Sequence, residues 1–99
     1  MPRFVLSVRA KKDITSIGRY TAKTWGKLQR NRYLSEITNA FNILTTPKFP
    51  HVRCTEFQQT FYRYNVGKHI VFYDIIEKDT IEIVRILHQS MDIPTQLSE

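Results

Sequence analysis

The sequence contains one cysteine, Cys54, and only three glycines among its 99 residues. A single cysteine excludes an internal disulfide, so nothing in the fold requires an oxidising compartment. With so few glycines, neither the P-loop nor the dinucleotide-binding fingerprint occurs. No apolar run approaches the roughly 20 residues of a membrane span, and the first one is too short for the apolar region of a signal peptide. We therefore expect a cytoplasmic protein without a membrane anchor.

The length and composition are typical of a single folded domain, and we expect residues 1–99 to form it. Hydrophobic residues make up 41% of the chain and aromatic residues 12%. A disordered chain is excluded, because this fraction of apolar side chains can offset the entropy lost on ordering. A multi-domain enzyme is excluded by length.

Basic residues are concentrated in the first half of the chain. Residues 1–50 carry ten Lys/Arg and two Asp/Glu, a net charge of +8, whereas residues 51–99 carry five Lys/Arg and seven Asp/Glu, a net charge of −2. The clustered cations are Arg9, Lys11, Lys12, Arg19, Lys23, Lys27, Arg30 and Arg32. Such a field attracts a nucleic acid or an acidic protein segment, or is a solvated face that keeps the protein soluble. Composition does not choose among these.

The chain begins with a predicted strand and a predicted helix. Residues Arg3–Arg9 alternate with the period of a half-buried strand. The strand places Phe4, Leu6 and Val8 on one face. From Ala10 the apolar residues recur every three or four positions, which indicates an amphipathic helix that Gly26 ends. The residues of this stripe are Ile14, Ile17, Thr21, Trp25 and Leu28.

A second amphipathic helix is predicted from about Lys27 to Thr45. Its apolar face consists of Tyr33, Ile37, Ala40, Phe41 and Leu44. Pro47 and Pro50 prevent the helix from continuing, because proline lacks the backbone donor. The short connection at Gly26 predicts that the two helices form an antiparallel hairpin.

The second half of the chain predicts an antiparallel meander of three strands. After a loop over Pro47–Glu56, residues Phe57–Val66 have the aromatic and threonine content of a strand. His69–Ile76 is apolar on both faces, as in a central strand covered on both sides or one whose outer face binds a partner. Thr80–His88 is the last strand, and the tail Ser90–Glu99 forms a single turn at most. We therefore predict an α+β fold with the helical hairpin on one face of an antiparallel sheet.

The same patterns predict part of the core. We assign Trp25, Ile37, Phe41, Phe72 and Ile83 to it. Tyr20, Tyr33 and Tyr73 are compatible with either the core or a surface groove.

Metal binding and cysteine chemistry have weak support. His51 and Cys54 are three positions apart, but a metal site needs three or four ligands, and His69 and His88 lie on other predicted strands. Cys54 as a nucleophile would need His51 as its base. We predict no metal site and no cofactor.

The last strand carries a basic residue on an apolar face. Alternation places Ile81, Ile83, Arg85 and Leu87 on one face, and Glu82, Val84, Ile86 and His88 on the other. Arg85 therefore reaches solvent, pairs with Asp74 or Asp92, or lines a surface that recognises an anionic partner. Arg63 lies in the predicted strand Phe57–Val66, among the aromatic residues Phe61, Tyr62 and Tyr64. This arrangement also suits stacking on nucleic-acid bases.

Two stretches of the sequence resemble the ParE-type toxins of bacterial toxin–antitoxin modules. That family shows a Gly, then H-[IV]-[IV]-F-Y, then I-x-[IV]-x-R-[IV]-L-H-x-x-M-D, which is matched by GKHIVFYDIIEKDTIEIVRILHQSMD from Gly67. Its N-terminal pattern, L-[ST]-x-x-A-x-x-D-[IL]-x-x-I-x-x-Y-[ST] followed by W-G, is matched from Leu6 to Gly26. The resemblance implies the RelE/ParE-like fold: one strand, a helical hairpin and a three-stranded antiparallel sheet.

The resemblance also implies a function and two partners. ParE-like toxins poison DNA gyrase and are neutralised by a cognate antitoxin, often through an acidic C-terminal segment, so DNA would be met only through the antitoxin or gyrase complex. For target binding and toxicity we assign Arg63, Arg85, His88, Met91 and Asp92. For antitoxin binding we assign Lys12, Arg19, Lys23, Lys27 and Arg30.

The alternative is a ribosome-dependent mRNA endonuclease, as in the RelE-like branch of the superfamily. This chemistry needs a base for the 2′-hydroxyl and cations for the phosphate, which Arg63, Arg85 and His88 would supply. Strand alternation points Arg85 and His88 to opposite faces, which favours the binding mechanism.

Overall fold

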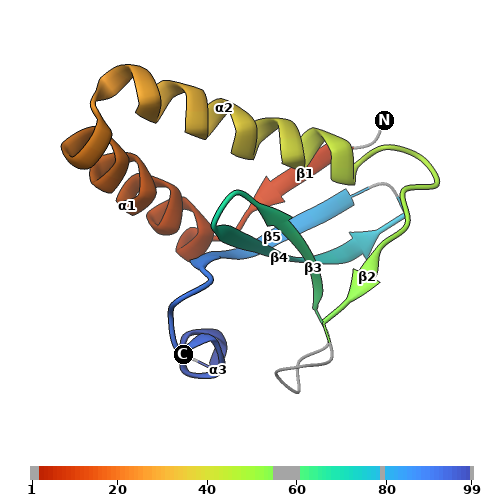
Figure 1. The fold of residues 1–99 in the computed structure, drawn as a ribbon. Helices are drawn as coiled ribbons and strands as arrows, with labels where there is room; N and C mark the ends of the chain where they lie inside the picture. The colour runs from red at the N-terminus through yellow and green to blue at the C-terminus, as the bar shows by residue number, and fades with distance from the viewer. Residues whose placement is uncertain (1–2, 55–60, 79, 99) are drawn as a thin grey trace.

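The fold is seen in a computed structural model that describes residues 3–54, 61–78 and 80–98. A helical hairpin covers one face of a five-stranded sheet (Figure 1). The elements in chain order are β1 (Arg3–Leu6), α1 (Val8–Trp25), α2 (Lys27–Leu44), β2 (Val52–Arg53), β3 (Tyr62–Val66), β4 (His69–Glu77), β5 (Thr80–His88) and α3 (Ile93–Ser98). Within the described residues, no helix has the length and apolar character needed to cross a membrane. The predicted α+β class and the order of strand, hairpin and meander are confirmed.

The five-stranded sheet is mixed, because the first strand, whose pairing the sequence did not predict, joins the antiparallel meander in parallel. Its strand order is β1-β5-β4-β3-β2. The meander β3-β4-β5 is antiparallel as predicted, but β1 pairs with β5 in parallel, with Phe4 opposite Ile81. A parallel pair needs a long connection in the sequence, so that the chain can run along the second strand in the same direction as along the first. Here the helical hairpin and the strands β2, β3 and β4 form that connection.

The first strand is shorter than predicted, because Ser7 is the N-cap of α1, which begins at Val8. The Ser7 hydroxyl accepts a hydrogen bond from the Ala10 N–H at 3.0 Å, as an N-cap residue does. Val8 therefore lies in the first helical turn and is 68% exposed, whereas the strand prediction placed it on the apolar face. Phe4 does face the core, where its ring lies 5.1 Å from that of Phe41.

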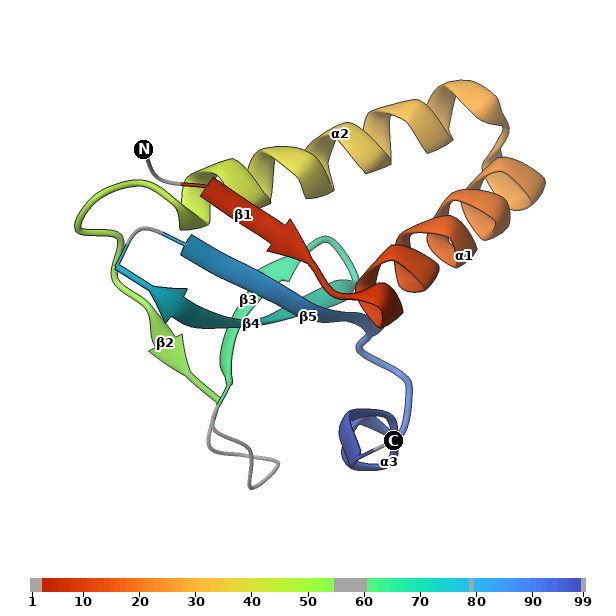
Figure 2. The ribbon, with the colours of Figure 1, turned by 180° about the vertical axis from the view of Figure 1, so that it is seen from behind.

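A single residue, Gly26, connects α1 to α2. Its N–H donates to the Ala22 carbonyl and its own carbonyl accepts from the Arg30 N–H, so it closes one helix and opens the next. Its φ of 93° lies in the region that only glycine adopts readily. Figures 1 and 2 show this turn extending beyond the sheet. Trp25 is consequently 71% exposed, and its assignment to the core is wrong.

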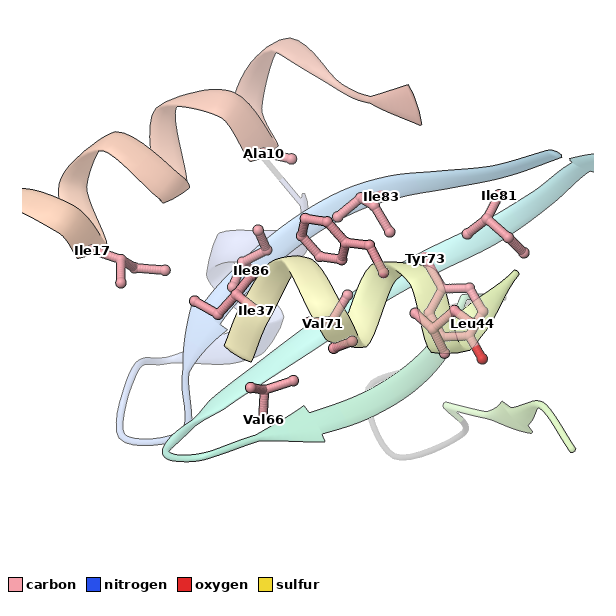
Figure 3. Close-up of a cluster of buried hydrophobic side chains, with 12 residues drawn as sticks. Ala10, Ile17, Ile37, Leu44, Val66, Val71, Tyr73, Ile81, Ile83 and Ile86 are labelled. Carbon is pink, nitrogen blue, oxygen red and sulfur yellow. The ribbon is translucent and has the colours of Figure 1, made fainter. Parts of the chain in front are cut away.

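The main core lies between the hairpin and the sheet (Figure 3). Ile37 and Phe41 of α2 pack against Val71, Tyr73 and Ile83 of the sheet, and all five are at most 1% exposed. The core assignments of Ile37, Phe41, Phe72 and Ile83 are confirmed.

A second apolar cluster lies on the other face of the sheet, next to α3. It consists of Cys54, Ile70, Phe72, Leu87 and Ile93. Figure 2 shows α3 on the side of the sheet away from α2. The two-sided apolar pattern of β4 is therefore that of a strand covered on both faces, and the tail is a six-residue helix rather than a single turn.

The region predicted as a loop contains a short strand. β2 pairs with β3 through Val52 opposite Arg63 and Arg53 opposite Tyr62. Residues 55–60 lie outside the described residues. They include the end of the predicted loop, residues 55–56, and the start of the predicted strand, residues 57–60. The described part of that strand begins at Tyr62.

Candidate functional site

A register shift in β5 determines where Arg85 lies. Arg85 is opposite Phe72, whereas Ile83 is opposite Tyr73, so Val84 is an extra residue in the β5 strand. Such a bulge reverses the faces of the residues that follow it. Arg85 therefore does not share a face with Ile83, as simple alternation predicted.

Arg85 is buried in an ion pair with Asp13 of α1. Its Nε donates to Asp13 Oδ2 at 2.8 Å and its Nη2 donates to Oδ1 at 3.0 Å. Its Nη1 donates to the Gln96 carbonyl of α3 at 2.9 Å. The carboxylate partner of Arg85 is thus Asp13, and the predicted pairing with Asp74 or Asp92 is wrong. Arg85 is 8% exposed, and its guanidinium joins the first helix to the last.

Side chains from the start of α1 complete the hydrogen bonding of β5 where β1 ends. The Ser7 hydroxyl donates to the Val84 carbonyl at 2.7 Å, and Asp13 Oδ2 accepts from the Ile86 N–H at 2.9 Å. These bonds satisfy backbone groups that a longer β1 would otherwise pair. Asp13 thus serves both the backbone of β5 and the Arg85 side chain.

A basic groove of about 810 Å³ runs between α1 and α2. Its lining residues are Ile14, Thr15, Gly18, Arg19, Ala22, Lys23, Lys27, Arg30, Asn31 and Leu34. Gly18 and Ala22 are the smallest of these side chains, and a Cβ on Gly18 would lie in ordinary contact with Leu34 Cδ1, at 3.5 Å. Four of the five cations predicted to bind the antitoxin line this groove, and the fifth, Lys12, does not.

The five residues predicted to bind the target do not form one site. Arg63 and Arg85 lie in one row across the sheet, with Phe72 between them. His88 lines a cavity between the hairpin and the sheet, and Met91 is exposed after the end of β5. Asp92 accepts a hydrogen bond from the Thr95 hydroxyl and so helps to begin α3.

The cavity that contains His88 has a volume of about 540 Å³, and we call it the histidine pocket. Its lining residues are Tyr20, Thr21, Trp25, Gln29, Tyr33, Gly67, Lys68, His69 and His88. It shares no lining residue with the basic groove. The hairpin therefore presents a cationic groove and, separately, an aromatic wall.

Hydrogen bonds fix the orientation of both imidazoles in the histidine pocket. The Tyr33 hydroxyl lies 2.5 Å from His69 Nδ1 and donates to the Val66 carbonyl at 3.1 Å. His88 Nδ1 accepts from the Ser90 N–H at 3.0 Å. The two rings meet edge to face at 5.1 Å between centroids, because His69 and His88 are directly opposite each other in the sheet.

The environment of the pocket keeps His69 neutral. Burial, reinforced by the neighbouring His88, lowers the pKa of His69 from 6.5 to about 4. Burial likewise raises the pKa of the Tyr33 hydroxyl. At neutral pH the pocket therefore holds an uncharged His69 and an uncharged phenol.

Sequence reasoning assigned neither His69 nor Asp13 to a site, and it left Tyr33, which lines the pocket, open between the core and a groove. The signal for Asp13 was its place in the ParE-like N-terminal pattern, but nothing in that pattern named its partner. The sequence patterns carried no signal for the pocket. In the structure Gly67, which lines it, has a φ of 56°, and a Cβ there would lie 2.9 Å from the Tyr33 ring and hydroxyl.

The two residues considered for metal or thiol chemistry, His51 and Cys54, pack against other side chains of the fold. Cys54 is fully buried in the second cluster. His51 Nδ1 lies 2.8 Å from the hydroxyl of Tyr73, and burial lowers the pKa of His51. In the described ranges, no three His, Cys, Asp or Glu side chains are grouped so as to hold a metal ion.

Comparison with solved structures shows the class of fold. The protein is similar to a chain of the chromosomal ParDE TA system from P. aeruginosa, with a TM-score of 0.75, covering 89% of this chain and 96% of that chain at 14% identity. The two chains therefore share one fold, a helical hairpin over one face of a small open sheet.

Sequence comparison shows the family. The family model of the ParE toxin of type II toxin–antitoxin system, parDE, matches residues 4–93. Toxin ParE1 of Mycobacterium tuberculosis is 31% identical over 96 residues, which are 96% of this chain and 97% of that protein. Toxin ParE of Escherichia coli is 27% identical over 99 residues, 100% of this chain and 96% of that protein. The chain therefore belongs to the ParE toxin family of type II toxin–antitoxin systems.

Proposed function

We propose that this ParE-family toxin acts by binding DNA gyrase and trapping it on cleaved DNA, and that a cognate antitoxin prevents this by binding the helical hairpin. The observation that carries the proposal is the match to the ParE family model over residues 4–93. The curated relatives named Toxin ParE span nearly the whole chain, which supports transfer of the family's mode of action.

The arrangement of the candidate residues favours binding over RNA cleavage. An endonuclease of the alternative type would need its base and its cations to meet at one phosphate. Arg85 is buried against Asp13, and its side chain lies on the α3 side of the sheet. His88 faces the hairpin on the other side. This geometry argues against joint catalysis by Arg85 and His88.

Two reactions test the proposed target. The purified protein is added to gyrase with plasmid DNA and, in parallel, to a translation reaction whose mRNA is examined for cuts. We expect loss of supercoiling in the first reaction and intact mRNA in the second. Unaltered supercoiling together with cuts at codon positions would support the endonuclease instead.

The basic groove is the proposed antitoxin site. Arg19, Lys23, Lys27 and Arg30 line it, and so do the small residues Gly18 and Ala22. Small lining residues allow the backbone of a docked helix to approach closely, while the cations make charge-assisted hydrogen bonds with acidic side chains. An acidic amphipathic segment that orders on binding fits both features.

A matched pair of charge reversals tests this site. Lys23→Glu with Lys27→Glu changes the groove, whereas Lys11→Glu with Lys12→Glu makes the same charge change on exposed positions outside its lining. We expect only the first pair to weaken antitoxin binding by tenfold or more, and rising salt to weaken the unaltered complex. Equal loss in both variants would show that only the overall charge matters, and a salt-insensitive complex would show that apolar packing dominates.

A further inference from the structure

The histidine pocket exposes two aromatic side chains of α1 beside polar groups of the sheet. Tyr20 is 67% exposed and Trp25 is 71% exposed, although both line the same cavity. A volume of about 540 Å³ is in the range of small-molecule sites, which combine apolar walls with a few placed polar groups. The ion pair of Arg85 and the cations of the basic groove play no part in this cavity.

The two imidazoles give the pocket one hydrogen-bond donor and one acceptor. Because His88 Nδ1 accepts from the Ser90 N–H, the proton of its neutral ring is on Nε2, which is a donor. We assign the Tyr33 hydroxyl proton to the Val66 carbonyl, so that His69 Nδ1–H donates to that hydroxyl and His69 Nε2 is an acceptor. The low pKa of His69 keeps its ring uncharged at neutral pH.

A neighbouring donor and acceptor match the pairing edge of a nucleobase, which always carries both. The aromatic faces of Trp25 and Tyr20 provide stacking surfaces, which are tolerant of base identity. Lys68 lies next to His69 in the wall of the pocket and supplies a cation for a phosphate. An aromatic side chain of a protein partner would use the stacking surfaces but would leave the imidazole nitrogens and Lys68 without partners.

We propose that the histidine pocket binds a single unpaired nucleotide, with its base against Trp25 and Tyr20, its edge on His69 and His88, and its phosphate on Lys68. The proposal concerns binding and no bond is made or broken. It does not depend on gyrase, so it is tested with the toxin alone.

Trp25 is the sole tryptophan of the chain, so its fluorescence reports directly on this pocket. Deoxyadenosine monophosphate, deoxyadenosine and deoxyribose 5-phosphate are titrated into the purified toxin. We expect the nucleotide to quench Trp25 with a Kd of about 1 mM or tighter, the nucleoside to bind more weakly, and the sugar phosphate to leave the fluorescence unchanged. Absence of quenching by the nucleotide would overturn the proposal.

Two lysines at opposite ends of β4 provide a matched control. Lys68→Ala removes the proposed phosphate contact, and Lys78→Ala removes the same charge beyond the far end of the strand. We expect Lys68→Ala to weaken nucleotide binding at least fivefold with no effect on the nucleoside, and Lys78→Ala to change neither. Equal effects of the two variants would overturn the phosphate contact.

A peptide arm separates a nucleotide from a protein side chain. An acidic peptide with one phenylalanine is titrated in the same way and in competition with the nucleotide. We expect it to leave the Trp25 signal unchanged. Quenching by the peptide but not by the nucleotide would assign the pocket to a protein partner and contradict the proposal.

Discussion

At the scale of single residues, the Arg85–Asp13 pair is the contact that ties the ends of the chain to the sheet. The carboxylate belongs to α1, the guanidinium belongs to β5, and the Gln96 carbonyl that completes the network belongs to α3. A buried charge that loses its partner keeps its desolvation cost. The Arg85 side chain therefore contributes mainly to stability in this structure.

Arg85→Ala should lower the free energy of unfolding by about 3–5 kcal/mol, because it leaves the Asp13 carboxylate buried without its counterion. Urea denaturation followed by far-UV circular dichroism measures this change. Arg32→Ala, on the exposed surface of α2, is the control and should change stability little. If Arg85→Ala leaves the unfolding midpoint unchanged while toxicity is lost, Arg85 contacts the target instead.

Gly67→Ala should destabilise the protein by more than about 1 kcal/mol, since an L-residue at a φ of 56° is strained and its Cβ would meet Tyr33. Thermal unfolding measures the change. The matched substitution Gly18→Ala adds a Cβ in ordinary contact with Leu34 inside a helix, and it should stabilise by about 0.5–1 kcal/mol. The same sign for both variants would contradict this account of the Gly67 turn.

The wrong predictions for Trp25 and Arg85 each have a physical cause. The helical period correctly put Ile17 and Trp25 on one stripe, but it carries no information on where the sheet beneath the helix ends. Trp25 is exposed because the hairpin extends past that point. Alternation misplaced Arg85 because a bulge at Val84 has no local signal of its own.

At the scale of elements, the start of α1 organises the edge of the sheet. The Ser7 hydroxyl accepts from the Ala10 N–H and also donates to the Val84 carbonyl. One side chain thus caps a helix and satisfies a strand. The length of β1 and the position of α1 depend on this residue.

Ser7→Ala should lower the free energy of unfolding by about 1–2 kcal/mol, through loss of the N-cap and of the bond to Val84. Chemical denaturation measures it. Ser16→Ala, at an exposed position inside α1, is the control and should be neutral or slightly stabilising because alanine is the better helix former. Equal effects at the two positions would show that Ser7 is not an important cap.

The sequence predicted the strands and helices that have a strong period, but it did not predict which strand β1 pairs with in the sheet. The apolar run of β4 and the alternation of β5 place both strands correctly to within a residue. The parallel pairing of β1 with β5 depends on how the hairpin returns the chain, which local patterns do not encode. β2 has only two residues and is too short to show a period.

At the scale of the whole molecule, the excess positive charge of the first half lies largely on the hairpin. The structure gathers four of its cations around one groove between α1 and α2. The meander half, with a net charge of −2, supplies the imidazoles of the histidine pocket. Charge and aromatic exposure thus define two separate surfaces on one hairpin.

Stability should fall as pH decreases from 6.5 towards 4. In this window the unfolded chain protonates His69 at its ordinary pKa of 6.5, whereas the folded protein protonates it only near a pKa of about 4, so the unfolded state binds more protons. His51, whose pKa is also lowered, acts in the same direction. Urea midpoints measured across this range should decline, and His69→Gln should flatten the decline. Midpoints that rise on acidification would contradict the neutral state of His69.

If this ParE-family toxin traps gyrase on cleaved DNA, as we propose, the trapped complexes can be counted as broken plasmids. Gyrase, supercoiled plasmid and increasing amounts of the toxin are incubated, the protein is denatured with detergent and digested, and linear DNA is quantified. We expect linear DNA to increase with toxin concentration, to require gyrase, and to disappear when the antitoxin is added first. Plasmid that remains intact at all concentrations of a folded toxin that arrests cell growth would contradict the proposal.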